Sequence, residues 1–210
     1  MQYIAILDHQ HLDHSFFMKA FAESMALQKD CKSIILHGDS PYTDRLIQMG
    51  MMRDDAVLRS TRDLNHRIIA LLADNGISAI GINGYQKGII ERDDQQLAIE
   101  TGWIDNRPAA THLVISNLVR DKKTRRIIPV PLSHLADKLR KQLHWETLII
   151  FPDDDAELVP DQNREPNDNK SRITDKVPSD LKPLPDNCFL CATSDFGKLP
   201  DTSRLLRISE

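Results

Sequence analysis

Three short polar segments of this chain have residue types and spacings that could bind a ligand or do chemistry. The first is a histidine-rich cluster made up of His9, His11, Asp13 and His14. The second is the turn His37-Gly38-Asp39-Ser40-Pro41, and the third is the pair Asn83-Gly84. Each follows an apolar run typical of a buried strand. A strand that opens directly into a small-residue turn and a helix points free backbone N–H groups at an anion, so these turns predict a binding site.

The elements that would position these segments alternate between strands and helices. Short apolar runs predict buried strands over residues 3–7, 33–36 and 77–82, and apolar residues at helical spacing predict helices over 16–25, 43–49 and 57–72. Parallel strands need helical crossovers, so this order predicts a mostly parallel sheet with helices on both faces. The loop that leaves the first strand should then lie beside the His37 turn.

The pattern is less even after residue 88. Residues 113–118 and 126–130 are expected to form a hairpin around a basic tip at 122–126, followed by a helix over 135–143 and a strand over 147–151. The net charge of −4 and pI near 6.1 show no basic excess, so the tip indicates a solvated turn and no nucleic-acid partner is expected. No apolar run approaches the roughly 20 residues that cross a bilayer.

The composition divides the chain into three segments. Residues 1–151 form the expected α/β domain, and residues 152–186 hold six of the eleven prolines with ten acidic residues, which predicts a loop or linker. Residues 187–210 are expected to add short strands. Nothing at the start resembles a secretion signal, so a cytoplasmic protein is expected. The thiols of Cys188 and Cys191 are expected to pack as small apolar groups.

Residues 33–41, and the helix, strand and turn over 64–84, resemble the amino acid kinase family, above all acetylglutamate kinase. The resemblance implies a Rossmann-like three-layer αβα sandwich with a mostly parallel sheet, here with a truncated C-terminal half. It also implies a homodimer, a small acyl amino acid or other anion as ligand, and ATP with Mg²⁺ as cofactors if the protein is an active kinase.

The resemblance also implies a set of substrate-binding residues. They are Gly38, Asp39 and Ser40 in the second turn, Arg53 for a carboxylate, Asn65 on the long helix, and Asn83 with Gly84 after the third strand. Other interpretations stay open for several of them. Asp39 and Ser40 could instead cap the following helix, and Arg53 and Asn65 could be ordinary surface residues.

The first turn departs from the family pattern. Where the family has a Lys-x-Gly-Gly turn that holds the transferred phosphate, this chain reads Ile6-Leu7-Asp8-His9-Gln10, and Asp8 would repel phosphate oxygens by about several kcal/mol. The family's nucleotide-binding half is also largely missing after Phe151. The favoured hypothesis is therefore a degenerate acetylglutamate kinase-like protein, without competent phosphoryl transfer or a certain cofactor, that keeps a small-anion or partner-binding role. No catalytic residue is identified.

Two alternative functions remain open. One is an active ATP-dependent transferase that phosphorylates the carboxylate of an amino acid or acyl amino acid. The other is a metal-dependent hydrolase, because the spacing His-x-His-x-Asp-His over residues 9–14 resembles the zinc ligands of metallo-β-lactamase-like enzymes. The same histidines could equally be surface polar residues at the start of a helix.

Overall fold

The computed structural model describes residues 1–28, 30–105, 108, 111–152, 177–178, 181–184, 188–203 and 205–208. Its main sheet has seven strands in the order β11-β10-β9-β1-β2-β6-β3. Their bounds are β1 (Gln2–Leu7), β2 (Lys32–His37), β3 (Ala79–Asn83), β6 (His112–Ser116), β9 (Thr147–Ile150), β10 (Cys188–Leu190) and β11 (Leu206–Ile208).

Every pair in this sheet is parallel except β10 with β11. In the register, Leu7 lies opposite His37, and Ser116 lies opposite both His37 and Asn83. The loops that follow β1, β2, β6 and β3 therefore leave the same edge of the sheet side by side. The expected position of the first loop beside the His37 turn is confirmed.

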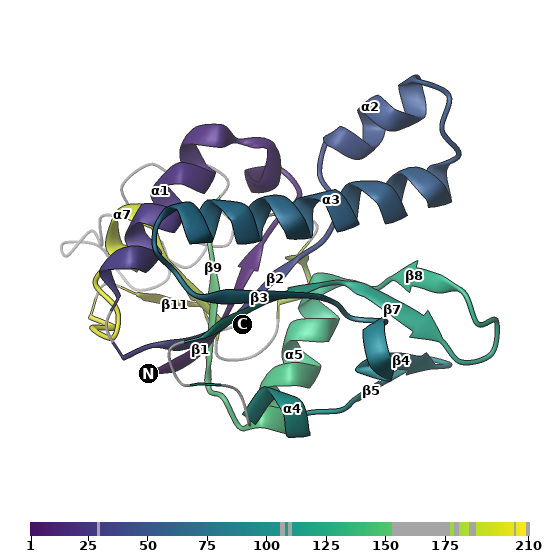
Figure 1. Cartoon of the computed structure of the whole chain (residues 1–210). Coiled ribbons are helices and arrows are strands. Elements are labelled where there is room, and N and C mark those ends of the chain that lie inside the picture. The colour runs from purple at the N-terminus through teal and green to yellow at the C-terminus, as the bar shows by residue number, and fades with distance from the viewer. Residues whose placement is uncertain are drawn as a thin grey trace.

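Helices cover both faces of the sheet (Figure 1). One face carries α1 (Ser15–Leu27), α3 (Arg53–Asp74) and α7 (Thr193–Phe196), and the other carries α4 (Gly102–Asp105) and α5 (Leu132–Leu143). The short helix α2 (Tyr42–Gln48) packs against α3. The expected three-layer α/β architecture is confirmed, and the predicted helices lie within a few residues of their observed bounds.

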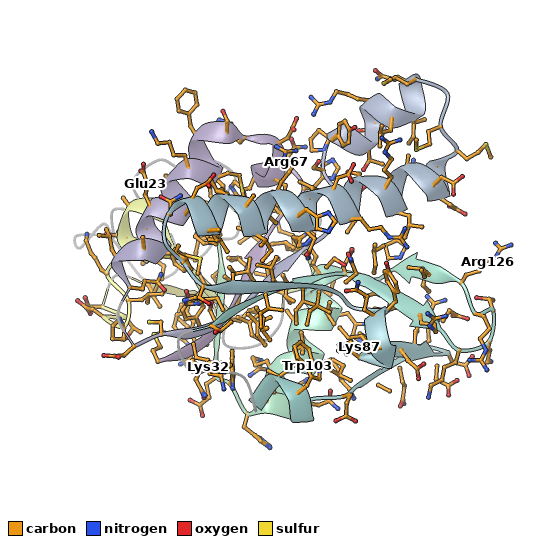
Figure 2. The ribbon with its side chains drawn as sticks, in the orientation of Figure 1. Glu23, Lys32, Arg67, Lys87, Trp103 and Arg126 are labelled. Atoms are coloured by element: carbon orange, nitrogen blue, oxygen red, sulfur yellow. The ribbon has the colours of Figure 1, made fainter. Side chains whose placement is uncertain are left out.

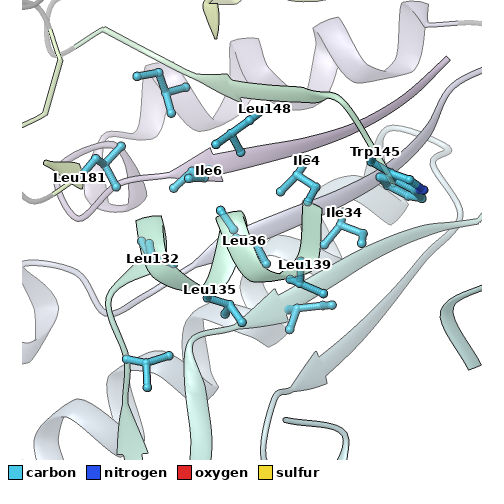
Figure 3. Packing of buried hydrophobic residues seen from close by; sticks show 14 of the residues in the cluster. Ile4, Ile6, Ile34, Leu36, Leu132, Leu135, Leu139, Trp145, Leu148 and Leu181 are labelled. Atoms are coloured by element: carbon cyan, nitrogen blue, oxygen red, sulfur yellow. The ribbon is translucent and has the colours of Figure 1, made fainter. Parts of the chain in front are cut away.

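Alternating residues of the strands separate two hydrophobic cores. Ile4 and Ile6 of β1 point toward α5, where they meet a leucine stripe at helical spacing made up of Leu132, Leu135 and Leu139 (Figure 3). A fully buried leucine or isoleucine contributes about 1.5–3 kcal/mol. Because α5 is polar elsewhere, this stripe fixes which side of the helix faces the sheet.

The opposite core is aromatic. Phe21 of α1 stacks on Phe196 of α7 with ring centroids 5.3 Å apart, and Phe151, directly after β9, meets Phe196 edge-on at 5.1 Å. Tyr3 of β1 also contacts Phe196 at 5.7 Å. The C-terminal helix is therefore part of the same core as the N-terminal strand.

A second sheet of four strands, in the order β5-β4-β7-β8, stands beside the main one. Its strands are β4 (Ile90–Asp93), β5 (Gln96–Ile99), β7 (Leu118–Asp121) and β8 (Ile127–Pro129). The expected hairpin between 113–118 and 126–130 is wrong in its first strand, because residues 112–116 pair within the main sheet and β7 is the partner of β8. The basic tip does join the two hairpin strands.

The chain passes from one sheet to the other at Asn117. Its backbone N–H donates to the carbonyl oxygen of His37 at 2.9 Å, while its own carbonyl accepts from the N–H of Val130 at 3.0 Å. Its side-chain amide donates to the carbonyl of Val130 at 2.8 Å. One residue thus bonds to both sheets, which a continuous apolar run does not reveal.

The C-terminal strands expected near 188–192 and 205–208 are present as β10 and β11. Cys188 and Cys191 are buried free thiols, and burial raises the pKa of Cys188 to about 12. The expected linker 152–186 lies largely outside the described residues, and the three segment boundaries stay a prediction. None of the helices in the described part is both long and apolar enough to span a bilayer.

Candidate functional site

The loops after β1 and β2 meet at the carboxyl edge of the sheet. Nδ1 of His9 lies 3.5 Å from Oδ1 of Asp39, and the two side chains are 30% and 33% exposed. Burial favours the protonated form of Asp39, but the hydrogen bond and charge of His9 outweigh it and hold the pKa of this carboxyl below its usual value. The edge therefore presents a partly open histidine–aspartate pair to the solvent.

The β1 turn is closed by its own aspartate. Oδ1 of Asp8 accepts the N–H groups of Gln10 and His11 at 2.8 and 2.9 Å. The next two N–H groups, of Leu12 and Asp13, bond to backbone carbonyls. Four successive amides of this turn therefore already have protein acceptors and do not form an anion cradle.

Asp8 is 1% exposed and points into the protein, not toward an incoming phosphate. The expected repulsion between Asp8 and a phosphate stays a prediction, and the occupied N–H groups give a second reason why this turn is unfit for phosphate. A carboxylate that accepts two N–H bonds holds a tight turn in the way that an N-cap residue does. The sequence alone could not tell which way this side chain turns.

His11 joins the β1 turn to the end of β9. Nδ1 lies 2.8 Å from Oδ2 of Asp8, and Nε2 lies 2.9 Å from the carbonyl oxygen of Pro152. The ring is 6% exposed and stacks on Phe17 with centroids 4.0 Å apart. Nε2 makes a hydrogen bond, whereas Nδ1 and Oδ2 of Asp8 lie close without hydrogen-bond geometry, so His11 is a buried link to Pro152.

The remaining members of the histidine-rich cluster point to separate partners. Nδ1 of His14 accepts the N–H of Phe17 and caps α1, while Oδ1 of Asp13 accepts from Nη2 of Arg45 at 2.8 Å. Within the described part of the chain, no three His, Cys, Asp or Glu side chains converge as a metal site would require. The zinc hypothesis for this cluster is untested by solution data and stays a prediction.

The β2 turn differs from the β1 turn in one free amide. Among the described residues, the N–H group of Ser40 has no protein acceptor, whereas the register of β1 with β2 directs the N–H of Gly38 to the carbonyl oxygen of Leu7. A Cβ on Gly38 would lie 3.3 Å from the side-chain nitrogen of Asn117, so the backbone is closely approached here. The helix-capping alternative holds for Ser40: its Oγ accepts the N–H of Tyr42, the first residue of α2, at 3.3 Å, while Pro41 occupies the N-cap position without a side-chain bond.

Beneath this turn, His37 and Asn65 form a buried pair. Nδ1 of His37 donates to the carbonyl of Gly38 at 2.9 Å, and its Nε2 accepts from the side-chain amide of Asn65 at 3.0 Å. A carbonyl can only accept, so the proton is on Nδ1 and the ring is neutral. Burial lowers the pKa of His37 to about 4 despite the opposing bond to Gly38.

Asn65 is 2% exposed, so the interpretation of this residue as an ordinary surface residue is wrong. Its amide nitrogen also lies 3.3 Å from the carbonyl of Val114 and 3.4 Å from that of Ile82. These contacts connect α3 with β2, β6 and β3. Arg53, by contrast, is the exposed first residue of α3 at the tip of the α2–α3 pair.

The Asn83-Gly84 turn lies at the next strand end. Oδ1 of Asn83 accepts from Oγ of Ser116 at 2.9 Å, and its N–H donates to Oε1 of Gln86 at 2.8 Å. A Cβ on Gly84 would lie 2.7 Å from the carbonyl oxygen of Leu118, so only glycine fits. This turn is fixed by close packing.

The sequence analysis missed Asn117. It is 9% exposed, its Oδ1 has no partner among the described residues, and it lies against Gly38. The sequence did contain a signal for this residue, because Asn117 interrupts the largely apolar run 113–119. A polar side chain within a buried run usually has hydrogen-bond partners that explain its presence. Asn117 therefore extends the group of polar residues beneath the β2 turn.

A scan against protein-family models and a search of curated sequences found no match. Solved structures do match. An isopentenyl phosphate kinase is similar with a TM-score of 0.67 and 12% identity, over 100% of both chains. Aspartokinase III from E. coli, in complex with aspartate and ADP, is similar with a TM-score of 0.63 and 10% identity, over 100% of this chain and 65% of that one.

N-acetylglutamate synthase from Neisseria gonorrhoeae, complexed with coenzyme A and L-arginine, also matches. Its TM-score is 0.60 at 12% identity, over 99% of this chain and 61% of that one. Identities at this level establish the fold and leave the activity open. The mostly parallel sheet, its helical layers and these three similarities agree: the chain has the amino acid kinase fold.

Proposed function

We propose that this protein binds a small anion at the β2 turn and does not carry out phosphoryl transfer. The free N–H group of Ser40 and the partly exposed ring of His9 beside this turn offer hydrogen-bond donors to an anionic group. Asp39 is paired with His9, which limits its repulsion of a ligand. A carboxylate or phosphate of a small acyl amino acid is the kind of group that would fit.

The observation that carries the proposal is the contrast between the two turns. Asp8 and the backbone carbonyls occupy the four amides of residues 10–13, whereas in the described part of the β2 turn the amide of Ser40 has no protein acceptor. Phosphoryl transfer depends on donors and cations that stabilise charge as it develops on the phosphate. A turn whose donors are already used cannot supply that stabilisation.

Two measurements test the absence of transfer. Calorimetry with ATP and Mg²⁺ is expected to show no binding tighter than about 1 mM, which corresponds to about −4 kcal/mol. Radiolabelled ATP is expected to transfer no phosphate to isopentenyl phosphate, aspartate or N-acetylglutamate, the small molecules named with the similar structures. Micromolar ATP binding together with label in any acceptor would favour the active-kinase alternative instead.

Anion binding is tested separately by nuclear magnetic resonance with N-acetylglutamate and inorganic phosphate as probes. The amide signals of Gly38 and Ser40 are expected to shift, and His9→Ala is expected to weaken binding several-fold. His66→Ala is the matched control, because His66 is an exposed histidine on α3. Equal effects of the two substitutions, or no shift at residues 38–40, would contradict the proposed site.

The hydrolase alternative has its own measurement. Metal analysis after dialysis of the purified protein would show about one zinc or more per chain if residues 9–14 bound metal, and His9→Ala with His14→Ala would remove it. The homodimer and the cytoplasmic location likewise remain predictions from the resemblance. Sedimentation equilibrium measures the first, and fractionation of cells measures the second.

A further inference from the structure

A cavity of about 760 Å³ lies beside β3, on the open edge of the main sheet. It is bounded by β3, by the segment around η2 (Gln86–Gly88), by Arg120 of β7 and by the residues that follow β5. Figure 2 labels two of its lining residues, Trp103 and Lys87, below β3. None of residues 38–40 lines it, so this cavity is separate from the β2 turn.

The walls of the cavity are mainly apolar and aromatic. Ile80, Ile82 and Ile89 supply aliphatic surface, and Trp103 and Tyr85 supply rings. Ile80 is 43% exposed, which is unusual for isoleucine in a strand of a main sheet. A cavity of this volume with such walls has the size and surface of a small-molecule site.

Tyr85, in one wall of the cavity, is held in place by Arg62 of α3. The guanidinium carbon of Arg62 on α3 lies 5.3 Å from the ring centroid of Tyr85, a cation–π contact. Lys87 takes a left-handed backbone conformation with φ of 53°, and Gly88 follows with φ of 70°. Residues other than glycine adopt such conformations at a cost of about 1 kcal/mol, and they gather at functional sites.

The charges around the cavity are unbalanced. Among the described residues, no carboxylate pairs with Lys87 or Arg120. The third charged lining residue, Glu100, already accepts the N–H of Gly102 through Oε1. The cavity therefore has two cations and one carboxylate on its lining.

Other cations of the same small sheet do have partners. Arg92 pairs with Asp121, Lys122 with Glu91, and Lys123 with Asp94. Several basic side chains of this region are thus neutralised by ion pairs, whereas Lys87 and Arg120 line the cavity without an ion pair among the described residues. Unpaired cations beside an apolar wall complement an anion with an apolar body.

We propose that this cavity binds a small amphipathic anion, which has an aromatic or branched apolar body and one carboxylate, sulfonate or phosphate group. The body lies against Trp103 and the isoleucines, and the anionic group meets Lys87 and Arg120. This site is distinct from the proposed anion site at the β2 turn, so the failure of either proposal leaves the other intact.

The test uses the fluorescent probe anilinonaphthalene sulfonate with the full chain, and phenylnaphthylamine as its uncharged analogue. Replacing both cations, by Lys87→Gln with Arg120→Gln, is expected to weaken sulfonate binding about tenfold and to leave the uncharged probe unaffected. Glu100→Gln keeps the acceptor for Gly102 and removes the negative charge. It is expected to tighten sulfonate binding about threefold.

The matched control removes two charges elsewhere on the same small sheet. Arg125→Gln with Arg126→Gln lies on the exposed hairpin tip, outside the cavity lining, and is expected to change sulfonate binding less than about twofold. Thermal unfolding of each variant confirms that it is folded, since unfolded chains also bind these dyes.

Three results would overturn the proposal. Equal sulfonate affinity of the Lys87 and Arg120 double variant and the unmodified chain would show that the cations do not contribute. Equal affinity of the unmodified chain for both probes would show that charge plays no part. Loss of probe binding in step with self-association, measured by sedimentation, would show that a second copy of the chain covers the cavity.

Discussion

At the scale of single residues, the buried histidines of this protein serve as hydrogen-bonding links. His37 donates from one ring nitrogen and accepts with the other, and His11 contacts a carboxylate and a carbonyl. Both histidines stand at strand ends where a catalytic role was conceivable. His37 uses both ring nitrogens and His11 is buried, which leaves the 30% exposed His9 and the exposed His14 as the histidines of this edge that a ligand can reach.

The neutral state of His37 makes stability depend on pH. Its pKa is about 4 in the folded protein against 6.5 ordinarily, so the unfolded chain binds the proton more readily. The stabilisation is complete above pH 6.5 and is lost as the pH falls toward 4, up to about 3 kcal/mol. We expect His37→Gln to flatten this part of the stability profile, as measured by urea unfolding across pH.

The exposed His66 provides the comparison for that experiment. His66→Gln is expected to keep the slope of the unmodified protein between pH 6.5 and 4, because it replaces an exposed side chain on α3 and leaves the buried His37 and its partners unchanged. If His37→Gln and the unmodified protein lost stability in parallel, another group would be responsible for the acid sensitivity.

Two aspartates of the same loop should differ strongly when replaced. Asp8→Ala leaves two amides without their acceptor and removes the carboxylate beside the buried His11, and we expect it to cost about 3 kcal/mol or more. Asp13→Ala removes an ion pair with Arg45 that is largely in solvent, and we expect about 1 kcal/mol or less. Urea unfolding measures both, and similar losses would show that Asp8 does not hold the turn.

At the scale of elements, the packing of α3 on β3 depends on one glycine. A Cβ on Gly81 would overlap Oδ1 of Asn65 and lie 2.8 Å from Cγ1 of Ile69. The absent side chain lets the helix come close enough for Asn65 to reach the carbonyls of the sheet and Nε2 of His37. The position of α3, and with it the support under the β2 turn, therefore requires glycine at this point.

We expect Gly81→Ala to destabilise the fold by about 1–3 kcal/mol, the usual cost of an extra methyl group in a packed site. Gly102→Ala is the comparison, since its Cβ would meet only the flexible end of Glu100 at 3.2 Å, and we expect a change within about 0.5 kcal/mol. Thermal unfolding checks both. A tolerated alanine at 81 would mean that α3 shifts without loss.

At the scale of the whole molecule, the sheet order makes the two ends of the sequence depend on each other. β9 and β10 extend the sheet on one side of β1, and β2, β6 and β3 extend it on the other. Phe196, close to the C-terminus, packs against Tyr3, Phe21 and Phe151. The short C-terminal segment is therefore a component of the core that supports the candidate edge.

Phe196→Ala should accordingly cost about 3–5 kcal/mol, the range for a large aromatic removed from a core. Phe16→Ala provides the control, because that ring is 80% exposed on α1 and its removal should change stability by about 0.5 kcal/mol or less. Urea unfolding of the full chain measures the difference. Equal stabilities of the two variants would show that the C-terminal helix is only loosely attached.

The sequence by itself determined the fold class and most of the elements. The continuous apolar run 3–7 indicates a strand buried on both faces, leucines at helical spacing fix the buried side of α5, and the Gly38 turn ends β2. These signals are local, since the period of burial is written into neighbouring residues. The resemblance over residues 33–84 then indicated the amino acid kinase fold, which the solved structures confirm.

Only the tertiary structure decided which polar groups are free. His11 bonds to Pro152, 141 residues later, and Asn117 bonds to both sheets, so their partners cannot be found within any short window. A short window of sequence also cannot show that the side chain of Asp8 is buried. Nor can it show the cavity beside β3, whose lining comes from four separate stretches of the chain. Chemistry at a site depends on distances that exist only after distant segments have packed together.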